Sequence, residues 1–248
     1  MPDEHRHWMA QAIGLARDMQ GWVWPNPAVG CVIVRDGVCV GRGQTQIGGR
    51  PHAERVALDA AGAQARGSTL YVTLEPCCHY GKTPPCADAI IEAGVTHVHA
   101  SLQDPDPRVN GGGFRKLREA GVTVTVGPGA AEAQVIMAGF FHRIATGRPL
   151  VSTGSAFDAH ESIPDGFDAM LISKAGHIKL VLRASGHHPA AETLPHPCNA
   201  DDLLDQLGRR GLTTVFIPGG DPLLLLLAPA IEAQRHPSLP ASAYIMRP

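Results

Sequence analysis

The first 126 residues alternate between helical and strand patterns. Apolar positions recur at helical spacing over residues 4–20 and stop at Gly21, which predicts an amphipathic helix. Two runs rich in β-branched residues flank Asp36-Gly37 and predict a β-hairpin. Further helices are expected over residues 52–67, 85–92 and 114–119, and further strands over STLYVTLEP, THVHASL and VTVTV. This alternation predicts an α/β sandwich around one central, largely parallel sheet.

The pattern changes after Gly147-Arg148-Pro149. Pro, His and Gly accumulate, and only DAMLIS, IKLVLRA and TTVFIPGG have the composition of strands. We therefore expect a first domain over residues 1–146 and a second, smaller domain over 147–248. A unit of this size has difficulty burying enough apolar surface alone. We expect it to pack on the first domain or on another subunit, and the protein to form homo-oligomers.

Composition narrows the classes of partner. The chain has 248 residues, 44% of them hydrophobic, and a formal net charge of -2. Lys and Arg never run longer than a pair, which argues against nucleic acid and favours a small-molecule substrate. The start lacks signal-peptide character and no apolar segment approaches membrane-spanning length, so we expect no membrane partner and a cytoplasmic location. In such a chain, six cysteines favour thiols or metal ligands over disulfides.

Three short segments carry the candidate chemistry, although each is ambiguous alone: Pro51-His52-Ala53-Glu54, Pro76-Cys77-Cys78-His79 and Thr83-Pro84-Pro85-Cys86. A lone His-x-Glu is often just a capped helix, and cysteines near a strand end are often core thiols. Together the segments supply one imidazole and two thiolates, a set suited to Zn²⁺ with the fourth tetrahedral position open to water. Such an open site is typical of catalysis, and it would generate hydroxide for attack on an amidine carbon.

Two carboxylates lie near these segments. Glu54 comes two residues after His52, in the first helical turn, and can face the same pocket without binding the metal. It is the candidate proton carrier. Glu75 could act similarly, but a strand-end carboxylate more often caps the turn that follows it.

The motifs resemble those of a known superfamily, the zinc-dependent nucleoside and nucleotide deaminases, with their H-x-E and P-C-x-x-C pattern. The spacing departs from that pattern, because the second cysteine, Cys86, lies nine positions after Cys77. This longer loop resembles the deaminase half of the bifunctional riboflavin-biosynthesis deaminase/reductase family. PNPAVGCVIV, PHAE, YVTLEPC, HYGKTPPC and LQDPDPRVNGGG occur in that family's order across residues 3 to about 145.

The resemblance implies a cytidine-deaminase-like three-layer α/β/α sandwich and a set of site residues. His52, Cys77 and Cys86 would bind zinc, and Glu54 would be the catalytic acid and base. The remaining residues would bind the substrate and its phosphate: Asn26, His79, Lys82 and Asp104. For Asp104, a turn-forming role without substrate contact is an equal alternative.

Other positions receive structural interpretations. Cys78 stands where the family usually has serine, and adjacent residues rarely point at one metal, so we do not expect it to be a ligand. Cys31 and Cys39 are expected in the core of the hairpin, and Cys198 has no evident partner. Gln44-Thr45-Gln46 replaces a histidine common in the family, which indicates slightly different substrate contacts. Gly111-Gly112-Gly113 lacks the dinucleotide fingerprint and is interpreted as a flexible helix entry.

The second half resembles a shortened remnant of the family's reductase domain, an α/β domain of dihydrofolate-reductase-like fold that uses NADPH. GRPLVSTGSAFD is similar to a shortened first strand, and Pro218-Gly219-Gly220 replaces the family's late Glu-Gly-Gly. The lysine expected in the first strand is absent, and the region has about half the usual length. We expect neither reductase activity nor NADPH binding.

These observations lead to one main hypothesis and two alternatives. The main hypothesis is hydrolytic deamination of a phosphorylated small-molecule pyrimidine, 2,5-diamino-6-ribosylamino-4(3H)-pyrimidinone 5′-phosphate, to 5-amino-6-(5-phosphoribosylamino)uracil. One alternative is a deaminase of another nucleoside or nucleotide base, although the long cysteine loop argues against it. The other is a non-catalytic, zinc-stabilised scaffold subunit, which would have no need of Glu54.

Overall fold

The structure of the chain is a computed structural model, and it describes residues 3–81, 84–154, 163–183 and 191–234. The contacts divide the chain into two compact units. The first contains residues 1–19 and 28–136, and the second contains residues 20–27 and 137–248. The domain boundary expected between residues 146 and 147 stays a prediction.

The first unit is built on a five-stranded sheet with the order β2-β1-β3-β4-β5. Its strands are β1 (Gly30–Arg35), β2 (Val38–Gln44), β3 (Thr69–Leu74), β4 (His97–Leu102) and β5 (Thr123–Val126). The β1–β2 connection is the expected hairpin, in which Asp36 and Gly37 both have positive φ, as this two-residue turn requires. Strand β3 is buried along nearly its whole length, so it forms the centre of the unit.

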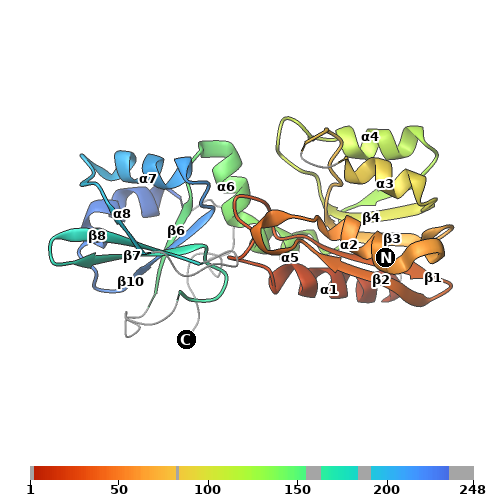
Figure 1. Cartoon of the computed structure of the whole chain (residues 1–248), viewed down its shortest axis with the longest axis horizontal. Helices are drawn as coiled ribbons and strands as arrows, with labels where there is room; N and C mark the ends of the chain where they lie inside the picture. Colours follow the sequence, from red (N-terminus) through yellow and green to blue (C-terminus); the bar gives the residue numbers. More distant parts are fainter. Residues whose placement is uncertain (1–2, 82–83, 155–162, 184–190, 235–248) are drawn as a thin grey trace. The chain divides into compact units, whose positions relative to one another are not determined.

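Helices cover both faces of this sheet (Figure 1). One face packs against α1 (Asp3–Arg17) and α5 (Ala130–Ile136), while α2 (Ala53–Ala61) packs on β1 and β2 of the other. Helix α3 (Cys86–Glu92) contacts α2 and α4 (Gly112–Glu119). Two short 3-10 turns, η1 (Ile47–Gly49) and η2 (Gly62–Ala65), flank α2. The result is three layers, helix, sheet and helix.

The sheet is mixed, whereas the sequence pattern predicted a largely parallel one. Strand β3 pairs in parallel with β4, and β4 with β5, but β1 is antiparallel to both β2 and β3. The crossover through α2 returns the chain in the direction of β2, as such connections do. Because β1 lies between β2 and β3, it opposes both neighbours.

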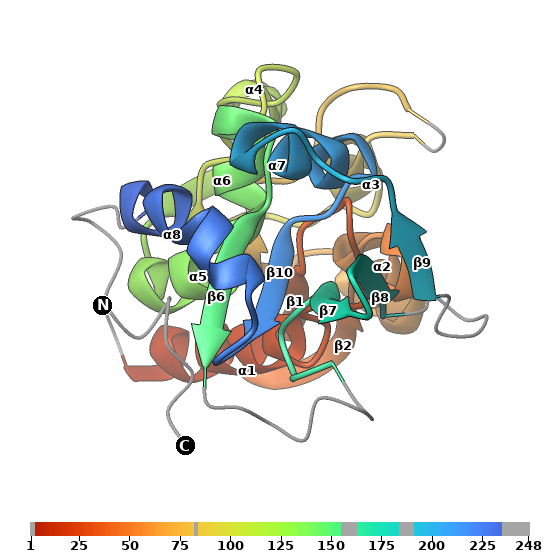
Figure 2. The ribbon, with the colours of Figure 1, turned by 90° about the vertical axis from the view of Figure 1, so that its left-hand side faces the viewer.

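The second unit contains another five-stranded sheet, ordered β6-β10-β7-β8-β9 (Figure 2). Its strands are β6 (Leu150–Gly154), β7 (Ala169–Lys174), β8 (His177–Leu182), β9 (Ala191–Leu194) and β10 (Thr214–Pro218). Strand β10 is parallel to β6 and β7, whereas β8 is antiparallel to its neighbours. Leucines of α7 (Ala200–Arg209) and α8 (Leu223–Ala233) pack on one face and form a continuous apolar core. Helix α6 (Ala138–Thr146) contacts β6.

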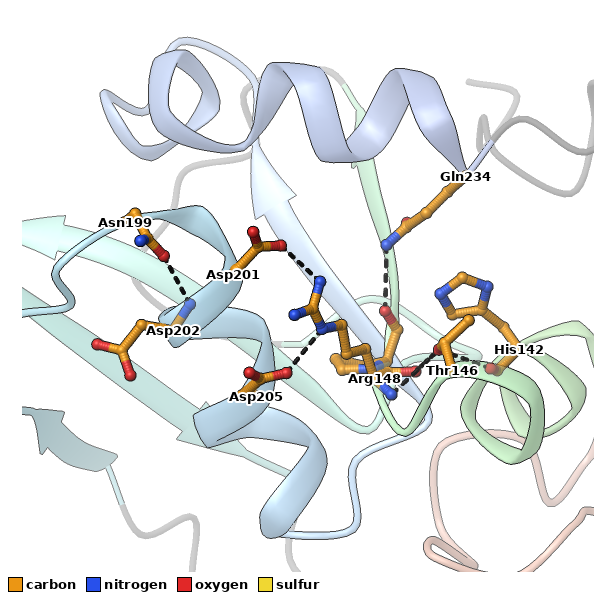
Figure 3. A network of polar contacts seen from close by, with 9 residues as sticks. His142, Thr146, Arg148, Asn199, Asp201, Asp202, Asp205 and Gln234 are labelled. Atoms are coloured by element: carbon orange, nitrogen blue, oxygen red, sulfur yellow. Dashed lines mark hydrogen bonds and ion pairs between the residues drawn. The ribbon is translucent and has the colours of Figure 1, made fainter.

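Polar contacts hold the beginning of β6 in place (Figure 3). The Arg148 guanidinium donates to Asp205 at 2.7 Å and to Asp201 at 2.5 Å, and both acceptors belong to α7. On the outer side of β6, the Gln234 carboxamide accepts from Val151 N at 2.9 Å and donates to Pro149 O at 3.4 Å. Arg148, two residues before β6, is thus bonded to α7, and Val151 of β6 is bonded to Gln234, the residue directly after α8.

Several elements were absent from the sequence-based expectation. The pattern did not predict helices α5, α6, α7 and α8 or strand β9, although the strands expected from DAMLIS, IKLVLRA and TTVFIPGG are present as β7, β8 and β10. Within the described part of the chain, every helix is too short or too polar to cross a bilayer.

Candidate metal centre

Three side chains of the first unit converge on one point. His52, Cys77 and Cys86 each offer one ligand atom, and these atoms all lie within 4.8 Å of one another. His52 Nδ1 is 3.7 Å from Cys77 Sγ and 3.4 Å from Cys86 Sγ. Among the described residues, no other group of three His, Cys, Asp or Glu side chains meets this condition.

The spacing of these atoms fits a zinc ion. A tetrahedral zinc with a Zn–N distance of about 2.05 Å and Zn–S distances of about 2.3 Å separates a bound nitrogen from a bound sulfur by about 3.6 Å. The two measured nitrogen–sulfur separations, 3.4 and 3.7 Å, lie on either side of this value. One imidazole and two thiolates also leave the fourth position free, as catalytic zinc sites require.

Two glycines allow the helix that carries His52 and Glu54 to lie close to the sheet. His52 is the residue immediately before α2, and α2 packs on β2. A Cβ atom added to Gly43 would lie 2.2 Å from Ala53 O, and one added to Gly41 would lie 2.3 Å from Ala57 O. Any side chain at these strand positions would therefore push α2 away from β2.

Backbone N–H groups at the start of α3 hold Cys77 close to Cys86. Cys77 follows β3, and Cys86 is the first residue of α3. The Cys86 N–H donates to Cys77 Sγ at 3.3 Å, and the Ala87 N–H donates to Cys77 O at 3.1 Å. The two ends of the eight-residue loop between the cysteines are thus bonded to each other, and both sulfurs lie near His52.

Among the three candidate ligands, the pKa of Cys77 is shifted toward the form that binds metal. Hydrogen bonding from Cys86 lowers the pKa of Cys77 to about 4, and His52 adds to this effect. The same contact with Cys77 raises the pKa of Cys86, and the hydrogen bond with Cys77 raises the pKa of His52. A thiolate, the form that binds metal, is therefore already stabilised at Cys77.

Glu54 lies beside this group and is 4% exposed. Burial raises its pKa to about 7, against the opposing effect of His52. Its carboxylate also forms a side-chain hydrogen bond with Cys86. A carboxyl group whose pKa lies near neutrality can both accept and return a proton, which is the property expected of an acid/base catalyst.

Glu75 has a structural role that the sequence only partly indicated. The side chain is buried, and its carboxylate accepts four backbone N–H groups from the loop after β4 and from the start of α4. The donors are Asp104 at 3.2 Å, Gly111 at 2.9 Å, Gly113 at 2.9 Å and Phe114 at 3.1 Å. The structural interpretation of Glu75 agrees with these bonds, but the carboxylate holds a distant loop instead of capping the turn after β3, and its connection to the three glycines was missed.

The four residues expected to contact substrate lie in different parts of the structure. Asp104 is buried in the loop after β4, and its Oδ1 accepts from Asp106 N at 2.9 Å, a turn-forming contact. His79 is half-buried in the cysteine loop, and its buried Nδ1 has no hydrogen-bond partner within the described part of the chain. Lys82 lies outside the described residues. Asn26 lies on residues 20–27 of the second unit, where its N–H donates to Val23 O at 3.0 Å.

The remaining cysteines lie outside the ligand group. Cys78 Sγ is directed to the carbonyl oxygens of Arg108 and Val109, at 3.6 and 3.9 Å. Cys31 is buried, and burial raises its pKa well above the usual value, as in an unreactive core thiol. Cys39 is half-buried and Cys198 is exposed.

Comparison with known proteins places the first unit among the deaminases. The model of the cytidine and deoxycytidylate deaminase zinc-binding region matches residues 2–102. The riboflavin biosynthesis protein RibD of Escherichia coli is 45% identical over 190 residues, which are 75% of this chain and 51% of that protein. The diaminohydroxyphosphoribosylamino-pyrimidine deaminase of Buchnera aphidicola is 48% identical over 144 residues, 58% of this chain and 98% of that protein.

A solved structure extends the similarity beyond the first unit. The diaminohydroxyphosphoribosylaminopyrimidine deaminase/5-amino-6-(5-phosphoribosylamino)uracil reductase of Thermotoga maritima superposes with a TM-score of 0.74 at 28% identity. The match covers 92% of this chain and 84% of that one. The predicted architecture, a cytidine-deaminase-like sandwich followed by a partial reductase-like α/β domain, is thereby confirmed. The chain nevertheless spans only about half the length of the E. coli relative.

Proposed function

Because this chain belongs to the family of riboflavin-biosynthesis deaminases, as its 48% identity over 98% of the Buchnera deaminase shows, we propose that it deaminates that family's pyrimidine substrate. The substrate is 2,5-diamino-6-ribosylamino-4(3H)-pyrimidinone 5′-phosphate. Water replaces its 2-amino group, which leaves as ammonia, and the product is 5-amino-6-(5-phosphoribosylamino)uracil. Atoms balance as in any amidine hydrolysis, with one water consumed and one ammonia released.

The observation that carries this proposal is the position of Glu54. Its carboxyl group is buried against a His/Cys/Cys group whose atoms have zinc-binding separations, and its pKa is raised to about 7. A metal site that served only to stabilise the fold would normally have a fourth protein ligand and would have no use for a proton carrier. The pairing of an open ligand set with a buried acid/base therefore favours catalysis over a scaffold role.

Each side chain has a defined task in the reaction. When zinc is bound, it lowers the pKa of a water molecule and so supplies a nucleophile at neutral pH. The Glu54 carboxylate takes one proton of the attacking water and delivers it to the ring nitrogen, and it then takes the second proton of that water and delivers it to the leaving amino group. His52, Cys77 and Cys86 hold the metal, and the packing of α2 on β2 fixes Glu54 relative to them.

Substrate binding is assigned to donors on the surrounding segments. We place the phosphate near His79 and Lys82, because the cysteine loop carries both residues next to the metal ligands. The buried Nδ1 of His79, which has no hydrogen-bond partner among the described residues, supports this role, because such a ring nitrogen is costly unless a ligand satisfies it. Asn26 and Asp104 are proposed to bind the pyrimidine.

Ammonia release tests the activity directly. Purified, zinc-loaded protein should release ammonia from the diaminopyrimidinone ribosyl phosphate and leave cytidine and deoxycytidylate essentially unchanged. Typical enzymes of this size turn over at about 1–10³ per second. Release from cytidine or deoxycytidylate instead would favour the deaminase of another base, and no release from any substrate would favour the scaffold.

We also propose that the second unit neither binds NADPH nor reduces the product. The turn after β10 ends at the start of α8, a place where helix N–H groups could receive a phosphate. Here the carboxylate of Asp221 already accepts from Leu223 N at 2.9 Å, from Ser173 Oγ at 2.8 Å and from Ser173 N at 2.8 Å. A dinucleotide phosphate at this turn would meet a negative charge.

Nucleotide titration tests this second proposal. Adding NADPH up to about 1 mM, a concentration that would reveal even a weak site, should give no saturable change in its fluorescence. Its absorbance should stay constant in the presence of the deamination product. Saturable binding or product-dependent oxidation of NADPH would show that the second unit is a working reductase.

A further inference from the structure

The carboxylate of Glu75 connects two segments that are distant in sequence. Glu75 lies directly after β3 and two residues before Cys77, whereas its four N–H donors belong to residues 104–114. Oε2 accepts from Asp104 and Gly111, and Oε1 accepts from Gly113 and Phe114. All lone-pair directions that a carboxylate commonly uses are thereby occupied. The side chain holds the loop without contacting a metal ligand.

The three consecutive glycines make this contact possible. Gly111 has a φ of 85°, which side chains rarely tolerate. A Cβ atom on Gly113 would lie 2.0 Å from Pro76 O, and one on Gly112 would lie 2.8 Å from Cys78 Sγ. The glycines are therefore needed for close approach to the strand end at Pro76 and Cys78. This corrects the expectation of a merely flexible helix entry.

The loop of residues 104–114 also contacts Cys78, the residue that follows Cys77 in sequence. Cys78 Sγ lies 3.6 Å from Arg108 O and 3.9 Å from Val109 O. The residues that flank the zinc ligand in sequence, Glu75 and Cys78, thus both contact residues 104–114. Displacement of this loop would move Asp104 relative to Cys77.

We propose that Glu75 is a positioning residue. Its carboxylate holds the loop of residues 104–114, and with it Asp104, in a fixed position relative to the candidate zinc ligands, so that the loop can bind the pyrimidine. This inference rests on the proposed function. It assigns Glu75 to substrate binding rather than to metal binding or proton transfer. Its contacts support that division, because all four are to backbone N–H groups of the loop.

Replacing Glu75 by glutamine tests the assignment. The amide keeps the shape of the side chain but turns one acceptor into a donor that faces two backbone N–H groups. We expect the variant to retain one zinc per chain. Its KM should rise on the order of tenfold or more, and its kcat should change less. The reason is that misplacement of a group by about 1 Å can lower the reaction rate by up to about 10²-fold. Amide hydrogen exchange should accelerate at residues 104, 111, 113 and 114 and stay constant at residues 86 and 87.

A matched control uses the same helix. Lys116→Gln removes the ion pair between Lys116 and Asp88 in the middle of α4 and leaves the first turn of that helix intact. Exchange at the loop, zinc content and KM should all stay at the values of the unsubstituted protein. A similar rise of KM in this variant would show that any weakening of α4 has the effect, and the role of Glu75 would then be structural only.

A second pair of variants covers the case in which the Glu75→Gln protein does not fold. Gly112→Ala places its new methyl group against Cys78 Sγ and should raise KM, whereas Gly112→Ala combined with Cys78→Ala removes the conflict and should restore it. Normal KM in both Glu75→Gln and Gly112→Ala, or loss of zinc from either, would overturn the inference. If the unsubstituted protein releases no ammonia, the proposed function fails, and hydrogen exchange with zinc content alone decides whether Glu75 holds the loop.

Discussion

Replacing Glu54 by glutamine should reduce ammonia release by about 10²–10⁴-fold, the contribution typical of a positioned acid/base group. The amide has the shape of the carboxyl group but cannot take the proton of the attacking water. Because the side chain is buried and its pKa is raised to about 7, the charged form is already disfavoured in the folded protein. A neutral amide should therefore cost little stability.

Three measurements on the Glu54→Gln protein separate the possible roles of this residue. Zinc content by atomic spectroscopy and the melting temperature should match those of the unsubstituted chain, while steady-state turnover collapses. Loss of zinc or of the folded state would make Glu54 a structural residue and would favour the scaffold interpretation. Turnover that persists within a few-fold would mean that another group carries the proton.

The second large effect is expected on zinc binding, when the adjacent residues Cys77 and Cys78 are replaced one at a time. The structure gives these two cysteines different roles. Cys77→Ala should strongly weaken zinc binding and abolish turnover, whereas Cys78→Ala should leave zinc binding unchanged. Changes to the partners that merely orient metal ligands already cost 10–100-fold in affinity, so loss of a ligand should cost more than about 10²-fold. Cys78 Sγ points to the carbonyl groups of Arg108 and Val109 instead.

Competition with a chromophoric zinc chelator measures both variants in one assay. The Cys77→Ala protein should release its zinc at a chelator concentration at which the unsubstituted and Cys78→Ala proteins keep theirs. Equal zinc affinity in all three proteins would remove Cys77 from the ligand set. Zinc loss from Cys78→Ala alone would reverse the assignment of the two cysteines.

Local patterns predicted most elements of the first unit, and for local reasons. The Asp36-Gly37 turn, the helix before Gly21 and the buried strand before Glu75 each depend on residues that are neighbours in sequence. The antiparallel position of β1 depends instead on which strand the crossover through α2 reaches, and no local pattern contains that information. Strand β9 was missed because three of its four residues are exposed, so its conformation follows from pairing with β8 rather than from its own composition.

The residues of the candidate site likewise include some that the sequence could predict and some that it could not. His52, Cys77 and Cys86 could be predicted because one imidazole and two thiolates together form a ligand set suited to zinc. The role of Glu75 could not, since its hydrogen-bond partners lie 29 to 39 positions further along the chain. The three glycines were the available signal, because consecutive glycines at a helix start often indicate that another segment passes close to the backbone.

Gln234 has a consequence for the edge of the sheet in the second unit. Among the described strands, β6 is at the end of its sheet, and an uncovered edge of this kind is a template for aggregation through strand pairing. The Gln234 carboxamide occupies Val151 N and Pro149 O, which are the groups that the peptide of an invading strand would use first. A single side chain directly after α8 thus occupies two backbone groups of this edge, which are then not available to pair with another strand.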